Sequence, residues 1–136
     1  MKELRIKAIT DNLGSVLSFV DEELEEAGCS FKIQNKIDLA VEEIFVNIAN
    51  YAYPDSAGDA VIRIGVSEDQ GIVTIEFSDQ GIPYDPLAKE DPDVDAPVEE
   101  REIGGLGIYM VKKMMDSMSY EYKDGQNVLT LTKTLQ

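Results

Sequence analysis

A carboxylate and an amide lie one helical turn apart in the segment that runs from Glu43 to Asn47. At about 100° per residue, both side chains fall on one polar stripe of a helix, whereas Glu42 falls on a different flank. The amide oxygen of Asn47 is a ligand that suits Mg²⁺ when the ion bridges phosphates. Glu43 is placed to orient or deprotonate an attacking hydroxyl or water. Solvated helix faces carry such residues too. This pair alone therefore does not decide between a catalytic magnesium site and a solvated helix face.

A second motif, Asp79-Gln80-Gly81-Ile82-Pro83, directly follows an apolar, β-branched run. Its carboxylate therefore stands where a predicted strand ends. An ionised carboxylate only accepts hydrogen bonds, so it can receive an exocyclic amine such as N6 of adenine, whereas guanine has a carbonyl there. The glycine lets the backbone approach a flat base closely. An ordinary turn has the same composition, and the motif by itself does not decide between a base site and a turn.

A third motif, Gly104-Gly105-Leu106-Gly107, runs into a helical pattern that begins at Ile108. Uncovered backbone amides at a helix start form, together with the helix dipole, a site for anions such as phosphate. The motif lacks the Gly-Lys-Ser/Thr ending of a Walker A loop and differs from a Rossmann fingerprint. A flexible hinge is the alternative interpretation.

The segment 84–103 separates the second motif from the third. It is acidic, contains Pro86, Pro92 and Pro97, and shows no hydrophobic periodicity. Irregular segments of this length are uncommon inside compact domains and tend to be functional. We expect a lid over a ligand site, with a solvated linker as the alternative.

Hydrophobic periodicity predicts an α+β framework for these motifs. Three helices are expected, the first starting near Thr10 or Asp11 and ending at Gly28, and the others covering 31–53 and 106–117. Strands are predicted at 4–8, 61–67, 72–78, 120–122 and 128–132, with the last two joined by a turn over 124–127. This order predicts a two-layer sandwich in which three helices pack on one face of a mixed, mostly antiparallel sheet.

Composition limits the classes of function. The 136 residues fit a single domain, and the net charge of −15 without a basic stripe argues against direct nucleic-acid binding. The same charge repels a triphosphate, so nucleotide binding would require a metal ion and backbone amides aimed at the phosphates. Cys29 is the single cysteine, which excludes an intrachain disulfide. No apolar stretch is long enough for a signal peptide or a membrane span, and we expect a cytoplasmic protein without a membrane partner.

Taken together and in this order, the motifs resemble the ATPase superfamily shared by histidine kinases and DNA gyrase. Within it, three segments are similar to the bacterial anti-sigma factor serine kinases: 39–47, 79–85 and 104–116. The resemblance implies a Bergerat-type, histidine kinase-like ATPase fold, with one ATP-binding domain over 1–136 and an ATP lid at about 84–103. It also implies ATP and Mg²⁺ as cofactors. Because the chain contains no histidine, an autophosphorylating histidine kinase is excluded.

The resemblance also implies roles for individual residues. Glu43 takes the place of the general base, and Asn47 that of the metal ligand. The residues implied in binding the nucleotide are Asn47, Asp79, Gly81, Pro83, Gly104, Gly105, Leu106 and Gly107. One position departs from the pattern, because the family often has a histidine four residues after the asparagine and this chain has Tyr51.

Three functional hypotheses follow from the sequence. The first is an anti-sigma-factor-like protein serine kinase that uses Mg-ATP to phosphorylate an antagonist (anti-anti-sigma) protein and that otherwise binds a sigma factor. The second is a non-catalytic, ATP-dependent partner-switching module, and the third is a degenerate domain without a ligand. The resemblance makes a homodimer plausible, although nothing in the composition requires one.

Overall fold

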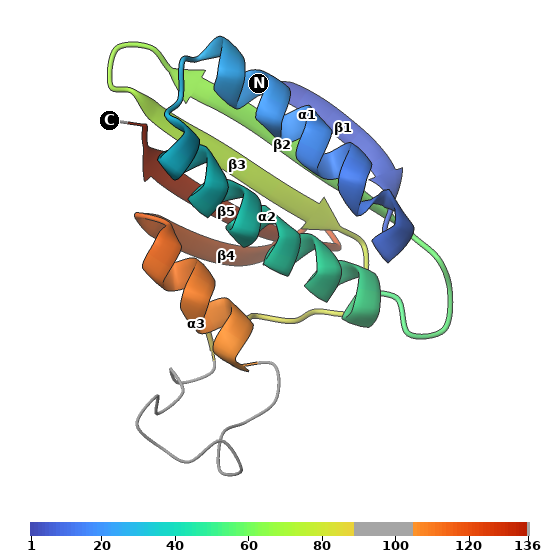
Figure 1. The fold of residues 1–136 in the computed structure, drawn as a ribbon. Coiled ribbons are helices and arrows are strands. Elements are labelled where there is room, and N and C mark those ends of the chain that lie inside the picture. Colours follow the sequence, from blue (N-terminus) through green and yellow to red (C-terminus); the bar gives the residue numbers. More distant parts are fainter. Residues whose placement is uncertain (89–104, 136) are drawn as a thin grey trace.

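A five-stranded sheet forms one layer of the protein and three helices form the other, in a computed structural model that describes residues 1–88 and 105–135 (Figure 1). The strands are β1 (Lys2–Lys7), β2 (Asp59–Ser67), β3 (Ile72–Asp79), β4 (Ser117–Lys123) and β5 (Gln126–Thr134). The helices are α1 (Leu13–Glu26), α2 (Phe31–Tyr51) and α3 (Gly105–Met114), with a short 3₁₀ turn, η1 (Thr10–Asn12), before α1.

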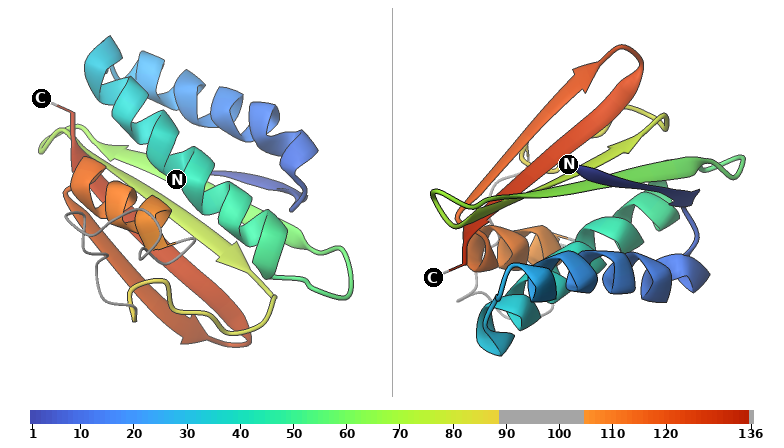
Figure 2. Two further views of the ribbon diagram at one scale, coloured as in Figure 1. Left: turned by 60° about the horizontal axis from the view of Figure 1, so that its bottom comes forward. Right: turned by 90° about the horizontal axis from the view of Figure 1, so that it is seen from above.

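The strands lie in the order β1-β2-β3-β5-β4, and each pairing between described strands is antiparallel. Seen along the sheet, α1, α2 and α3 lie on the same side of it (Figure 2). The predicted α+β class and the placement of three helices on one face are confirmed. The sheet differs from the mixed arrangement expected, since none of the described pairings is parallel.

Several predicted boundaries are wrong by a few residues. The third helix ends at Met114 rather than at residue 117, and Ser117 already begins β4. The second helix ends at Tyr51 rather than at residue 53, with Ala52 as its C-cap. The turn between β4 and β5 consists of Asp124 and Gly125 alone, whose φ angles of 55° and 78° are both left-handed. Such a pair forms a tight two-residue hairpin turn, and this shortening moves Asn127 from the predicted turn into β5.

The core lies between the sheet and the inner faces of α1 and α2. Alternate residues of the central strands point to this side, as in the cross-strand pairs Ile62–Phe77 and Ile75–Leu131. Phe45 from α2 packs among them, and all five of these side chains are at most 1% exposed. Because α2 is held by its apolar stripe, its remaining polar residues have fixed directions relative to the sheet.

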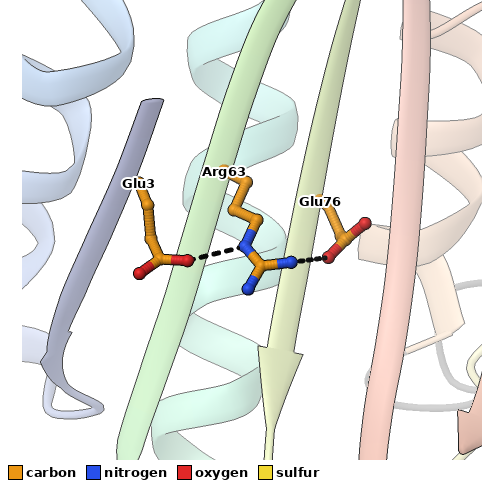
Figure 3. A network of polar contacts seen from close by, with 3 residues as sticks. All are labelled: Glu3, Arg63 and Glu76. Atoms are coloured by element: carbon orange, nitrogen blue, oxygen red, sulfur yellow. Dashed lines mark hydrogen bonds and ion pairs between the residues drawn. The ribbon is translucent and has the colours of Figure 1, made fainter. Parts of the chain in front are cut away.

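The opposite face of the sheet carries an ion-pair network that spans three strands (Figure 3). Arg63 on β2 bonds Glu3 on β1, with Nε and Oε1 2.7 Å apart, and Glu76 on β3, with Nη1 and Oε1 3.4 Å apart. The guanidinium is 47% exposed, so solvent screens the network and it stabilises the protein by no more than about 1 kcal/mol. The network therefore lies on a polar part of the sheet face that the helices leave uncovered (Figure 2).

Two carboxyl groups meet where α1 packs on α2. The Oδ1 atoms of Asp21 and Asp38 are both buried, and neither has a hydrogen-bond partner among the described residues. Burial, followed by the neighbouring Asp21 and then Glu25, raises the pKa of Asp38 to about 8. Nearby Cys29 is affected in the same way, since burial and then Asp38 raise the pKa of its thiol. Protonation of Asp38 removes the repulsion between the two carboxylates.

This pair predicts a defined pH dependence of stability. The pKa of Asp38 rises from 3.8 to about 8 on folding, so between these values the folded chain binds more protons than the unfolded chain. Its contribution to the free energy of unfolding is complete below pH 4 and is lost as the pH rises through about 8. We expect Asp38→Asn to unfold at a higher urea concentration than the wild type at pH 9, with a smaller difference at pH 6. Asp69→Asn, in the exposed β2–β3 turn, is the matched control, and identical pH profiles for all three proteins would contradict the assignment.

Candidate functional site

A cleft opens between the C-terminal half of α2 and the ends of β3 and β5. Three polar side chains line it, and they come from three elements: Asn47, Asp79 and Asn127. Its other lining residues are mainly apolar or aromatic: Ile44, Ile48, Tyr51, Ala52, Phe77, Ile82, Tyr84, Pro86, Tyr120 and Leu129. Such a lining, apolar with a few convergent polar groups, is typical of sites for small organic ligands.

Asp79 is the last residue of β3 and is only 7% exposed. Its Oδ1 accepts hydrogen bonds from the backbone N–H of Gly81, at 2.9 Å, and from Nδ2 of Asn127, at 3.0 Å. Both bonds that the described residues make to this carboxylate end on Oδ1. The predicted position of Asp79 at a strand end, facing a crevice, is thus present.

Asn127 is a site residue that the sequence analysis missed. Its Nδ2 donates to Asp79 and to the carbonyl of Ile82, at 2.9 Å, while its Oδ1 accepts from the backbone N–H of Tyr84, at 3.1 Å, and from the hydroxyl of Tyr120. The signal was available, because Asn127 continues the alternation of Leu129 and Leu131 on the core-facing side of β5. A polar residue in that series, 6% exposed, requires partners.

Gly81 has a structural reason to be glycine. A Cβ at this position would lie 2.6 Å from Cβ of Ala52 and would overlap the carbonyl oxygen of that residue. The next residue, Ile82, donates its N–H to the same carbonyl at 3.0 Å. The segment after β3 is therefore in close contact with the end of α2. The approach of Gly81 to a flat base stays a prediction. Pro83 is exposed and does not line the cleft.

Tyr53 also holds the segment that follows β3, through two hydrogen bonds of its hydroxyl group. Its hydroxyl donates to the carbonyl of Asp59, at 2.6 Å, and accepts from the N–H of Gln80, at 2.8 Å. One side chain thus joins the start of β2 to the residue after β3. The position of Asp79 is determined by backbone contacts on both sides.

Glu43 contacts the third motif. Its carboxylate lies against Gly107 in the first turn of α3, and a Cβ on that glycine would overlap Oε2 and would lie 3.3 Å from Cδ of Glu43. Asn47, one turn further along α2, faces the cleft. The helix therefore brings the first motif into contact with the third and toward the cleft that contains Asp79 of the second. Gly105 and Leu106 are the first two residues of α3, while Gly104 lies outside the described residues.

The predicted lid falls largely outside the described part of the chain. Of the segment 84–103, residues 84–88 are described, and Tyr84 and Pro86 line the cleft. Asn47 is the candidate metal ligand that faces the cleft. In the described ranges no group of three or more carboxylate, thiol or imidazole side chains is arranged to hold a metal ion. A single amide oxygen fits Mg²⁺, which commonly keeps water and ligand phosphates as its other partners.

The contact of Gly81 with α2 generates a prediction. Gly81→Ala should lower the free energy of unfolding by about 1–3 kcal/mol, because the added methyl group must displace the end of α2 or the segment after β3. Gly14→Ala is the matched control, since no atom lies within 4 Å of a Cβ in that helical position and the change should stabilise by up to about 1 kcal/mol. Urea unfolding measures both, and equal stability of Gly81→Ala and the wild type would contradict the contact.

Comparison with known proteins agrees with this geometry. The chain matches the histidine kinase-like ATPase domain over residues 6–133. It is 27% identical to serine-protein kinase RsbW of Bacillus cereus strain AH187 over 138 aligned positions, which cover 98% of this chain and 84% of that protein. It is 26% identical to the protein of the same name from Bacillus mycoides strain KBAB4, with the same coverage.

A solved structure, the RsbU and RsbW domains of Rv1364c from Mycobacterium tuberculosis, has the same fold, with a TM-score of 0.68 at 20% identity. The likeness covers 99% of this chain and 33% of that one, so this chain spans about a third of its length. These matches confirm the predicted resemblance to bacterial serine kinases within the ATPase superfamily. On the match over residues 6–133, the chain belongs to the histidine kinase-like ATPase domain family.

Proposed function

We propose that this protein is an ATP-binding, anti-sigma-factor-like regulator that phosphorylates a serine of an antagonist (anti-anti-sigma) protein. One observation carries the proposal: Asn47 and Asp79 line one cleft, while Glu43 of the same helix lies against the first turn of α3. Helix α2 thereby contacts the described part of the third motif and lines the cleft that contains Asp79. In this proposal the ATP-binding domain comprises residues 1–136, with the lid at 84–103.

The cleft suits the adenine end of ATP. A flat base would lie among the apolar and aromatic lining residues, with its exocyclic amine directed to the carboxylate of Asp79. Because Oδ1 of Asp79 already accepts two hydrogen bonds, Oδ2 is the atom for this contact. Gly81 and Pro83 flank Ile82, which lines the cleft, and are assigned to this end of the nucleotide.

The start of α3 suits the phosphates. Backbone amides and the helix dipole favour anions at this end, and the glycines there leave the amides accessible. The residues assigned to this contact are Gly104, Gly105, Leu106 and Gly107. Mg²⁺, held by Asn47 and the phosphates, would supply the positive charge that screens the triphosphate from the acidic protein.

Glu43 is assigned the role of the general base. It lies at the start of α3, where the terminal phosphate would be, and it is exposed enough for a partner protein to reach. As the serine hydroxyl attacks, Glu43 accepts its proton, the terminal phosphoryl group passes to the serine oxygen, and ADP leaves. The proton is later released to solvent.

The partners would be the antagonist protein and a sigma factor. The relatives named serine-protein kinase RsbW support the kinase activity, and the net charge of −15 suits a basic surface on a DNA-binding partner. We place the protein in the cytoplasm, with a possible homodimer. Among the described residues, no helix combines the length and the apolar character that crossing a membrane requires.

Nucleotide binding can be tested through thermal stability. Mg-ATP at about 100 times its Kd should stabilise the fold by about 2.7 kcal/mol and raise the Tm by several degrees. Asn47→Ala should remove most of the dependence on Mg²⁺, because the proposed metal ligand is lost. Asn50→Ala is the matched control, since Asn50 lies on the same helix, is exposed and is not part of the cleft lining. An unchanged Tm of the wild type with Mg-ATP would favour a domain without a ligand.

The chemical role of Glu43 can be tested by phosphate transfer. Glu43→Gln should lower the rate of transfer to the antagonist serine by about 10²- to 10⁴-fold while ATP affinity stays near the wild-type value. Transfer is measured by mass spectrometry of the antagonist, and affinity by calorimetry. Glu42→Gln, on another flank of α2, should transfer normally.

Equal transfer by Glu43→Gln and the wild type would refute the assigned role. Tight ATP binding without transfer by the wild type would instead support the second hypothesis, a non-catalytic, ATP-dependent partner-switching module.

A further inference from the structure

We propose that Asn127 contributes to the purine specificity of the cleft by binding Oδ1 of Asp79, so that the other carboxylate oxygen, a hydrogen-bond acceptor, faces the ligand. The inference rests on the proposed ATP site and adds a residue that contacts Asp79 rather than the base. Asn127 is thus a positioning residue for specificity.

The orientation of the Asn127 amide follows from the backbone groups around it. Its Nδ2 faces the carbonyl of Ile82 at 2.9 Å, and a carbonyl only accepts. Its Oδ1 faces the N–H of Tyr84 at 3.1 Å, and an N–H only donates. Rotating the amide by 180° would place two donors together at Tyr84 and two acceptors together at Ile82. The amide is therefore locked, with its nitrogen toward Asp79.

This locked amide fixes the direction of the Asp79 carboxylate. Two donors, Nδ2 of Asn127 and the N–H of Gly81, converge on Oδ1 from 3.0 and 2.9 Å, so Oδ2 is the oxygen left for the ligand. The second oxygen then offers only lone pairs to the cleft, which matches the 6-amino group of adenine and opposes the 6-carbonyl group of hypoxanthine or guanine.

The same reasoning predicts a reversal of specificity. In Asp79→Asn, the two donors hold the new amide oxygen, so the amide NH₂ must face the ligand. The cleft then matches a 6-carbonyl base and opposes adenine. If Asn127→Leu is added, one of the two donors is lost while the N–H of Gly81 remains, so the amide of residue 79 is held in this direction less firmly. The double variant should therefore prefer a 6-carbonyl base less strongly than Asp79→Asn does.

The experiment measures affinities of Mg-ATP and Mg-ITP by calorimetry at pH 7, because the two nucleotides differ in the base at position 6 and have the same phosphates. The ratio of the two affinities cancels any general loss from disturbed packing. Wild type should favour ATP by about tenfold or more, and Asp79→Asn should favour ITP by a similar factor. Asp79→Asn with Asn127→Leu should favour ITP by a clearly smaller factor than Asp79→Asn alone.

Tyr120→Phe is the control for a purely structural role of Asn127. It removes the hydrogen bond from the Tyr120 hydroxyl to Oδ1 of Asn127 and leaves the direction of the amide unchanged. Both affinities should fall together, and the preference for ATP should persist.

The outcomes separate this inference from the proposed function. A wild type that binds neither nucleotide refutes the ATP site itself. A wild type that prefers ATP, with an Asp79→Asn variant that still prefers ATP, refutes the locked amide and leaves the ATP site intact. A double variant that prefers ITP as strongly as Asp79→Asn shows that Asn127 has no part in specificity. Folding of each variant is checked by circular dichroism, and Asp79→Asn alone provides a test if the double variant does not fold.

Discussion

The hydrogen bond from the N–H of Ile82 to the carbonyl of Ala52, at 3.0 Å, joins the end of α2 to the segment that follows β3. Gly81 permits this contact because any side chain would overlap the helix end. The bond sets the distance between Asn47, near the end of α2, and Asp79, at the end of β3. The cleft exists because a helix and a strand that pack through their apolar faces are also held together at their polar ends.

A second constraint is the charge of the site. The carboxylates of Glu43 and Asp79 both belong to regions assigned to an anionic ligand, in a chain with a net charge of −15. They are placed differently, because Asp79 is buried and held by two donors at the base end of the cleft, whereas Glu43 is exposed at the start of α3. In the proposed function, only Glu43 lies close to the phosphates. The attraction of the phosphates to a metal ion and to backbone amides must then exceed the repulsion from one nearby carboxylate rather than from two.

Local patterns predicted most of the fold, and tertiary contacts explain what they missed. The stripe of α2 follows from a period of 3.6 residues, so the directions of Glu43 and Asn47 were predictable. Asn127 was missed because the turn was predicted to contain four residues. The turn has two, so Asn127 belongs to β5, where its side chain has a fixed direction. The contact of Glu43 with Gly107 and the pairing of Asp21 with Asp38 join segments far apart in the sequence. Neither contact has a signature in either segment alone.

The position of Tyr51 indicates which property of the site differs when a tyrosine replaces the histidine that the family often has there. It lies one turn after Asn47 and lines the cleft together with Ile82 and Tyr84, with 58% of its surface exposed. Glu43 lies two turns earlier on α2, against the start of α3. In the proposed function, the tyrosine therefore belongs to the wall around the nucleotide and is separated from the general base. A tyrosine there should alter how tightly the nucleotide is held, while the proton transfer assigned to Glu43 does not depend on it.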